Sequence, residues 1–260
     1  MTSYDFDFLR YVERRKGARE AQSREGAAYA YGGDLKVLRT LDRLKPVRLA
    51  LEGTVRLWRG SARAEILGPA MKATERSQPK VFAATEACAA KLHIAPPVAY
   101  VTPAPIAGGL LAWTFGTDED PAILLHASLV EGSGEKELLD VLGRECGHVQ
   151  NNHVLYRTAL HFLLHAAGGF VRWIVKPATM ALGAWHARAA VTADRAGLLC
   201  GRDLEVSTRM IGRLAGEAEA KRRIEALGLF AASAYYTGLS GAPSGPNSAE
   251  CDAQVAKVLR

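Results

Sequence analysis

The stretch from Glu135 to Asn152, EKELLDVLGRECGHVQNN, constrains this chain more than any other part of its sequence. It is a near miss of a His-Glu-x-x-His zinc-binding helix, because Arg144 stands where the first histidine is expected. In the complete motif two histidines four residues apart share one helical face and bind Zn²⁺, and the glutamate accepts a proton from metal-bound water. Here Glu145 and His148 remain, and the guanidinium of Arg144 has no lone pair to donate to a metal.

The length and composition of the chain favour a single structural unit. With 260 residues, 48% of them hydrophobic, it can bury a core without disulfides. We expect an N-terminal helical extension over residues 1–61 packed on the core, a main domain over residues 62–236 and a flexible C-terminal tail over residues 237–260. The tail is expected to be flexible because it begins with TGLSGAPSGPNS, which is rich in Gly, Pro and Ser.

Cysteine usage and charge indicate the compartment and exclude one class of partner. The four cysteines are scattered without C-x-x-C spacing, and the N-terminus lacks a basic-then-apolar signal, which together predict a cytoplasmic location. The net charge is +6 and the pI about 9.2, but basic residues alternate with acidic ones. Because no nucleic-acid-binding motif accompanies the charge, we expect no nucleic-acid partner.

The spacing of apolar residues predicts an α+β fold that is mostly helical. Residues 4–30 are charged and alanine-rich, which predicts an exposed helix, and the leucines up to residue 60 predict two helices or one kinked at Pro46. Residues 78–92 predict another helix. The short runs VAYV, LLAWTF and AILL, bounded by Pro, Gly and Asp, predict strands of a small sheet just before the motif helix. A last long helix is expected from about Gly183 onward.

The most apolar stretch, Thr158 to Trp185, has three interpretations. We favour a buried core helix over an interfacial amphipathic helix, which would allow peripheral membrane contact, and over a membrane span. The uninterrupted portion, residues 159–175, is shorter than the about 20 apolar residues that cross a bilayer, and it contains ionisable side chains. His161 and His165 are four residues apart and could bind a metal, but no neighbouring acid or cysteine completes a ligand set, so packed polar positions are the favoured interpretation.

Three segments together carry a family resemblance. LLDVLGRECGHVQNNHVLY, preceded by TFGTDEDPAILLHASLV and followed by RAAVTADRAGLL, resembles the HtpX-like and CAAX-prenyl-protease-like gluzincin metallopeptidases, in particular their soluble bacterial relatives. The resemblance covers roughly residues 62–212 and implies a zincin fold with a small sheet beside the motif helix. In that family the metal ligands are the two motif histidines and a glutamate four residues before an aspartate. The aspartate matches Asp194, which would contact the ligands and not the metal itself. The glutamate falls on Ala190.

The resemblance therefore implies a degenerate site in which His148 is the only surviving metal ligand and Glu145 a vestigial general base. Neighbours are not expected to replace Arg144. On a continuous helix Cys146 would lie about 200° around from Arg144, and His153 about 140° from His148. The family cofactor is zinc, but we expect none here because one ligand is not a site.

Two functions remain open. The favoured one is a catalytically inactive metallopeptidase homologue that keeps a peptide-binding groove for a binding or regulatory role. The alternative is an active zinc metalloendopeptidase with a rearranged ligand set. If the site is degenerate, Arg144 is expected to turn into the former metal pocket and pair with Glu145 or Asp194, and the alternative is an outward Arg144 above an inert polar cavity.

An extended peptide or protein is the expected partner. In gluzincins the substrate lies along an edge strand beside the motif helix, and the resemblance places that strand at residues 110–116. Main-chain pairing at a strand edge needs no zinc. The alternative is an edge that the N-terminal helices cover. The candidate contact residues are Ala112, Trp113, Thr114 and Phe115.

Overall fold

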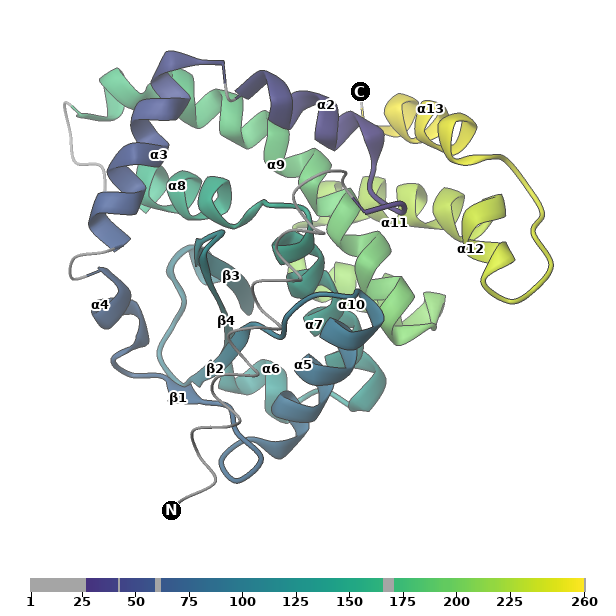
Figure 1. Cartoon of the computed structure of the whole chain (residues 1–260), viewed down its shortest axis with the longest axis horizontal. Helices are drawn as coiled ribbons and strands as arrows, with labels where there is room; N and C mark the ends of the chain where they lie inside the picture. Colours follow the sequence, from purple (N-terminus) through teal and green to yellow (C-terminus); the bar gives the residue numbers. More distant parts are fainter. Residues whose placement is uncertain (1–26, 42, 59–61, 166–170, 260) are drawn as a thin grey trace.

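The computed structural model describes residues 27–41, 43–58, 62–165 and 171–259. Most of the helix expected over residues 4–30 lies outside this range. The described end of that segment is not an exposed helix, because Tyr29 and Tyr31 are buried in the core. Figure 1 shows the chain as a helical molecule with one small sheet on one side.

In the described part of the chain, four helices precede the last strands of the sheet: α2 (Gly32–Leu41), α3 (Lys45–Leu57), α4 (Arg63–Leu67) and α5 (Pro79–Lys91). The two alternatives for the leucine-rich region resolve into two separate helices, α2 and α3. Pro46 lies in the first turn of α3, where its missing N–H breaks no helical hydrogen bond. The helix predicted over residues 78–92 is confirmed as α5.

The sheet has four strands, β1 (Met71–Lys72), β2 (Val98–Thr102), β3 (Ala112–Thr117) and β4 (Asp120–His126), in the order β1-β2-β4-β3. β2 and β4 are parallel, whereas β1 and β3 run antiparallel to their neighbours. A short 3₁₀ turn, η2 (Ala107–Gly109), precedes β3. The three predicted strands and their position before the motif helix are confirmed. β3 lies at one edge, as the resemblance implied.

Four helices follow: α6 (Ala127–Glu131), α7 (Glu135–Gln150), α8 (Val154–His165) and α9 (Val171–Gly201). α7 is the motif helix, and it packs very closely on α9 through two glycines. A Cβ added at Gly147 would lie 2.5 Å from Cβ of Ala196, and one added at Gly143 would lie 2.6 Å from Cβ of Cys200. Larger residues would push the helices apart, so these glycines set the distance between the motif residues and α9.

The described residues of the apolar stretch from Thr158 to Trp185 lie on two helices, α8 and α9, and residues 166–170 lie outside the described range. α9 runs through Pro177 and continues to Gly201, so the expectation of a separate last helix from about Gly183 is wrong. None of the helices that the structure describes is long and apolar enough to cross a membrane.

The C-terminal part consists of α10 (Leu204–Leu214), α11 (Glu217–Ala231), α12 (Ala234–Gly238) and α13 (Ser248–Val258). The expected flexible tail is therefore wrong, because it ends in a helix. Asn247 and Glu250 cap α13 reciprocally, and Cys251 and Val255 are buried. Figure 1 shows α13 beside α11 and α2. The boundaries proposed at residues 61 and 236 stay predictions.

Candidate active site

Arg144 lies inside the protein, between α7 and α9. Its Nε is 2.8 Å from Oδ1 of Asp194, and its side chain is only 7% exposed. Nε of Arg144 has no hydrogen-bond partner among the described residues, so this contact is an ion pair and not a hydrogen bond. The expectation that Arg144 turns inward and pairs with Asp194 or Glu145 is confirmed, and the alternative of an outward guanidinium is wrong.

Asp194 is a carboxylate held between two guanidinium groups. Arg223 of α11 donates two hydrogen bonds to it, from Nε to Oδ2 at 2.8 Å and from Nη2 to Oδ1 at 2.7 Å. A third bond joins Nη1 of Arg223 to Glu219 at 2.9 Å. Asp194 and Arg223 are both buried. Asp194 therefore holds α7, α9 and α11 together through two arginines.

Glu145 is also occupied by other protein groups. It accepts hydrogen bonds from Oγ1 of Thr114 at 2.5 Å and from Nη1 of Arg157 at 2.8 Å. Burial by itself raises the pKa of Glu145, but Arg157 and Arg144 outweigh burial, so the pKa lies below its ordinary value. A general base works best with a pKa near the operating pH. Glu145 is thus a paired anion and a weak base.

His148 contacts His153, which was expected on a different side of the helix. Nδ1 of His148 lies 3.0 Å from Nδ1 of His153, whose Nε2 lies 3.0 Å from Oδ2 of Asp34. The predicted 140° separation is wrong because it assumed a continuous helix. α7 ends at Gln150, and Asn152 adopts a left-handed conformation with φ of 57°, which brings His153 back toward His148.

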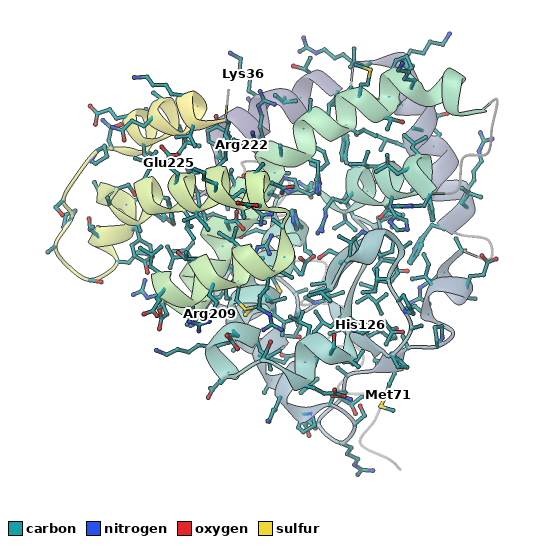
Figure 2. All side chains as sticks on the ribbon, turned by 180° about the vertical axis from the view of Figure 1, so that it is seen from behind. Lys36, Met71, His126, Arg209, Arg222 and Glu225 are labelled. Atoms are coloured by element: carbon teal, nitrogen blue, oxygen red, sulfur yellow. The ribbon has the colours of Figure 1, made fainter. Side chains whose placement is uncertain are left out.

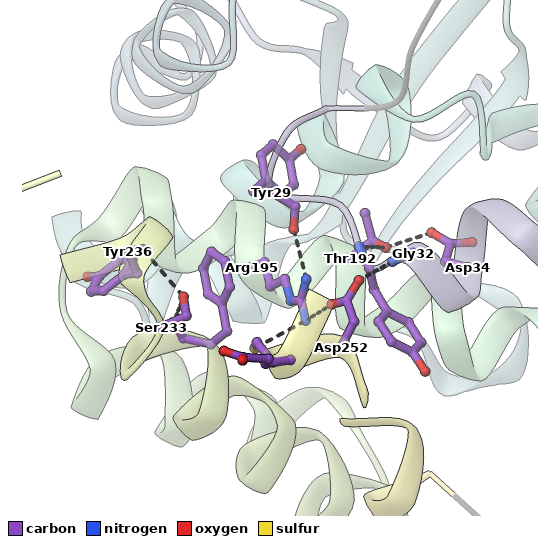
Figure 3. Close-up of polar contacts among 12 residues, drawn as sticks. Tyr29, Gly32, Asp34, Thr192, Arg195, Ser233, Tyr236 and Asp252 are labelled. Atoms are coloured by element: carbon purple, nitrogen blue, oxygen red, sulfur yellow. Dashed lines mark hydrogen bonds and ion pairs between the residues drawn. The ribbon is translucent and has the colours of Figure 1, made fainter. Parts of the chain in front are cut away.

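The N-terminal segment holds this histidine pair in place through Asp34, which contacts His153. Asp34 is fully buried and accepts hydrogen bonds from Thr192 at 2.6 Å and from Nε1 of Trp185 at 2.8 Å. Five residues earlier, before α2 begins, the carbonyl of Tyr29 accepts a bond from Arg195 at 3.0 Å. Figure 3 shows the bonds from Arg195 to Tyr29 and from Thr192 to Asp34, together with the contact from Gly32 to Asp252 of α13. The segment is part of the site's support rather than a loose extension.

The remaining predicted positions are buried. Ala190 lies on α9 one turn before Asp194 and has no side chain that could reach a metal. The four candidate residues of β3 are also buried. α8 covers this edge: the N–H of Gly116 donates to Thr158 at 2.9 Å, and Trp113 stacks on His161 with ring centroids 4.1 Å apart. The expectation of an open edge strand is therefore wrong, although α8 covers it instead of the N-terminal helices.

Among the described residues there is no group of three His, Cys, Asp or Glu side chains that could hold a metal ion. His161 and His165 lie close, with ring centroids 4.7 Å apart, but they belong to no such group. Arg157, Arg223 and Asp34, which organise the site, were missed from the sequence. Arg223 in particular forms an i,i+4 pair with Glu219, a pattern typical of a solvated helix face.

Acid is expected to destabilise the fold through three histidines. Burial, and next to it Arg157, lowers the pKa of His148 well below its usual value and that of His186 to about 3. Burial also lowers the pKa of His161 to about 4. Burial raises the pKa of Asp140 to about 6, which acts in the opposite direction. Between pH 6 and 4.5 the folded state therefore excludes three protons that the unfolded chain binds and takes up one, so about 2.7 kcal/mol of unfolding free energy is lost per pH unit.

Urea unfolding at pH 6, 5 and 4.5 measures this slope. His186→Gln removes one excluded proton, so the loss is expected to fall by half, to about 1.4 kcal/mol per pH unit. The control is His93→Asn, because His93 is exposed and asparagine also suits its left-handed backbone, and it is expected to keep the wild-type slope. An unchanged slope in His186→Gln would show that His186 takes up its proton in the folded state.

The model of peptidase family M48 matches residues 75–237. A curated relative, the plastoglobule-localized metallopeptidase 48 of the chloroplast of Arabidopsis thaliana, is 31% identical over 129 residues, which are 48% of this chain. The match spans 37% of that relative's length. No solved structure matches the chain.

Proposed function

Because the chain belongs to peptidase family M48, we propose that it is a catalytically inactive member with a degenerate zinc-binding motif and a binding or regulatory role. The observation that carries this proposal is the buried ion pair between Arg144 and Asp194. In this proposal Arg144 is a permanent cation at the position of the first metal ligand. Glu145, at the position of the general base, is paired with Arg157.

Family membership corrects one expectation. The chain was expected to have no cofactor, but peptidases of family M48 are zinc metallopeptidases, so Zn²⁺ is the cofactor that the fold implies. The described residues of this site do not fit that ion. Arg144 and Ala190 stand at two ligand positions, and Nδ1 of His148 contacts another histidine.

The two substitutions compensate each other in charge. Relative to the family pattern, Arg144 adds one positive charge and Ala190 removes one negative charge. Together they supply the two positive charges that a bound Zn²⁺ would contribute. Asp194 and Glu145 thus keep counterions in a buried place, where unpaired carboxylates would be costly. Compensation of this kind supports a maintained fold more than random decay of the motif.

Cleavage of an unstructured protein tests the proposal. The wild type, assayed on labelled casein with Zn²⁺ supplied, is expected to release no more fragments than the Glu145→Gln variant or buffer alone. Glu145→Gln is the matched control because it keeps the shape of the side chain and removes the general base. Thermolysin under the same conditions shows that the assay works.

The alternative, a zinc metalloendopeptidase with a rearranged ligand set, has the opposite outcome. In that case the wild type cleaves casein, Glu145→Gln does not, and a chelator abolishes the activity. Such a result would overturn the proposal. A cytoplasmic location and an extended peptide or protein partner are further parts of the proposal. Because α8 covers the edge of β3, a partner would bind elsewhere on the molecule.

A further inference from the structure

The exposed apolar side chains of the described residues are concentrated in one region. Five of the eight large hydrophobic side chains that are exposed belong to α3, the link before it, the end of α8 and the start of α9. These helices share a separate core around Val47, Leu182 and Trp185. Their outward side chains therefore face away from that core. The five are Leu44, Leu49, Leu57, Leu164 and Met180.

The outer side of α9 is an apolar stripe. Its exposed residues recur at helical spacing, and Met180 is 66% exposed. A Cβ added at Gly183 would meet nothing within 4 Å, so the stripe is open. The sequence from Val171 to Ala193 contains no Asp or Glu. The exposed residues of the stripe are Pro177, Met180, Gly183, Ala184 and Ala187.

The two helices α2 and α3, which both pack against α9, carry exposed basic side chains. The sequence from residue 32 to residue 58 has six Lys or Arg and three acids, Asp34, Asp42 and Glu52. Asp34 is fully buried against His153 and contributes nothing outside. The exposed basic residues of α2, α3, their link and the start of α9 are Lys36, Arg39, Arg43, Lys45, Arg48, Arg56 and Lys176.

We propose that this region, called the α3/α9 face, binds peripherally to the surface of an anionic lipid bilayer. Figure 1 shows α3 and the first half of α9 along one margin of the molecule. Leu49 and Met180 would enter the boundary between headgroups and acyl chains, and Lys45 and Arg48 would contact lipid phosphates. The same charge disfavours a second copy of the chain as occupant, because a symmetric contact would oppose two basic faces.

Vesicle co-sedimentation tests the proposal with the full chain. Binding to vesicles of phosphatidylcholine and phosphatidylglycerol is expected to be at least about tenfold tighter than to phosphatidylcholine alone, and to weaken from about 0.1 M to about 0.5 M NaCl. Lys45→Glu with Arg48→Glu is expected to lower binding at least about tenfold. Leu49→Ser with Met180→Ser is expected to weaken it also in high salt, because these residues act without charge.

The matched control reverses two charges far from this face. Lys72→Glu with Lys80→Glu, on β1 and α5, lowers the net charge from +6 to +2, as does the test pair. Figure 2 shows Lys36 of α2 and Met71, the neighbour of Lys72, at opposite ends of the molecule. The control is expected to bind like the wild type, and far-UV circular dichroism verifies folding of all variants.

Three results would overturn the proposal. One is equal binding to both kinds of vesicle, and another is an equal loss in the control variant, which would indicate a nonspecific effect of net charge. The third comes from light scattering without lipid. A dimer that Leu49→Ser with Met180→Ser dissociates, in a chain that does not bind vesicles, would assign the face to self-association.

Discussion

Asp194→Asn is expected to lower the free energy of unfolding by about 3–5 kcal/mol, the largest loss among single changes at the site. The asparagine has nearly the same shape but no charge. It leaves Arg144 without a counterion and can keep only one of the two bonds, of 2.8 and 2.7 Å, that hold Arg223 on α9, because the amide nitrogen cannot accept a hydrogen bond. Removing one partner of a buried ion pair leaves the other charge desolvated, which costs more than the pair contributed.

Two further variants separate this explanation from a general loss of packing. Arg144→Met removes one cation but leaves the bidentate pair of Asp194 and Arg223, so a loss within about 1 kcal/mol is expected. Glu205→Gln breaks an exposed pair with Arg209 at 3.9 Å and is expected to cost less than about 0.5 kcal/mol. Urea unfolding at pH 7.5 measures all three. A loss below about 1 kcal/mol in Asp194→Asn would show that water reaches the two arginines.

The sequence predicted the fold well where the pattern was local. Apolar spacing located α5 and the strands, and Pro46 indicated the boundary between α2 and α3. The predictions from the sequence failed where contacts between distant segments determine the structure. The tail was predicted to be flexible because its first residues are rich in Gly, Pro and Ser. Asn247 and Glu250, directly after those residues, form the cap that starts α13. α9 continues through Pro177, because packing on its neighbours outweighs one missing hydrogen bond.

The candidate site was predicted in part for the same reason. Arg144 and Asp194 could be paired from the sequence, because the motif fixes their places on adjacent helices. Arg157 and Arg223 could not, since their distance from Glu145 and Asp194 depends on how α8 and α11 pack. His153 was excluded as a neighbour of His148 because α7 was assumed to continue past Gln150. The turn at Asn152 that brings it to His148 is a left-handed residue, for which asparagine is one of the few suitable side chains.

The double variant Arg144→His with Ala190→Glu is expected to bind Zn²⁺ at least about 100-fold more tightly than the wild type or either single variant, because a catalytic site needs three protein ligands. His148, which would be the third ligand, is already held in place by its neighbours. Nδ1 of His148 is held by His153, which Asp34 orients, so Nε2 is the nitrogen left for a metal. Removing Arg144 also leaves the pair of Asp194 and Arg223 intact. Competition with a chromophoric chelator at pH 7.5 measures the affinities.

The same variant is expected to remain inactive on casein. Its restored ligands would hold the ion, but Glu145 would still be paired with Arg157 at 2.8 Å and hydrogen-bonded to Thr114, so it would be a poor proton acceptor. The size-matched control is Arg144→Gln with Ala190→Gln, which fills the same positions without histidine or carboxylate donors and is expected to bind Zn²⁺ no better than the wild type. Similar affinities in the single and double variants would show that Arg144 or Ala190 does not stand at a ligand position.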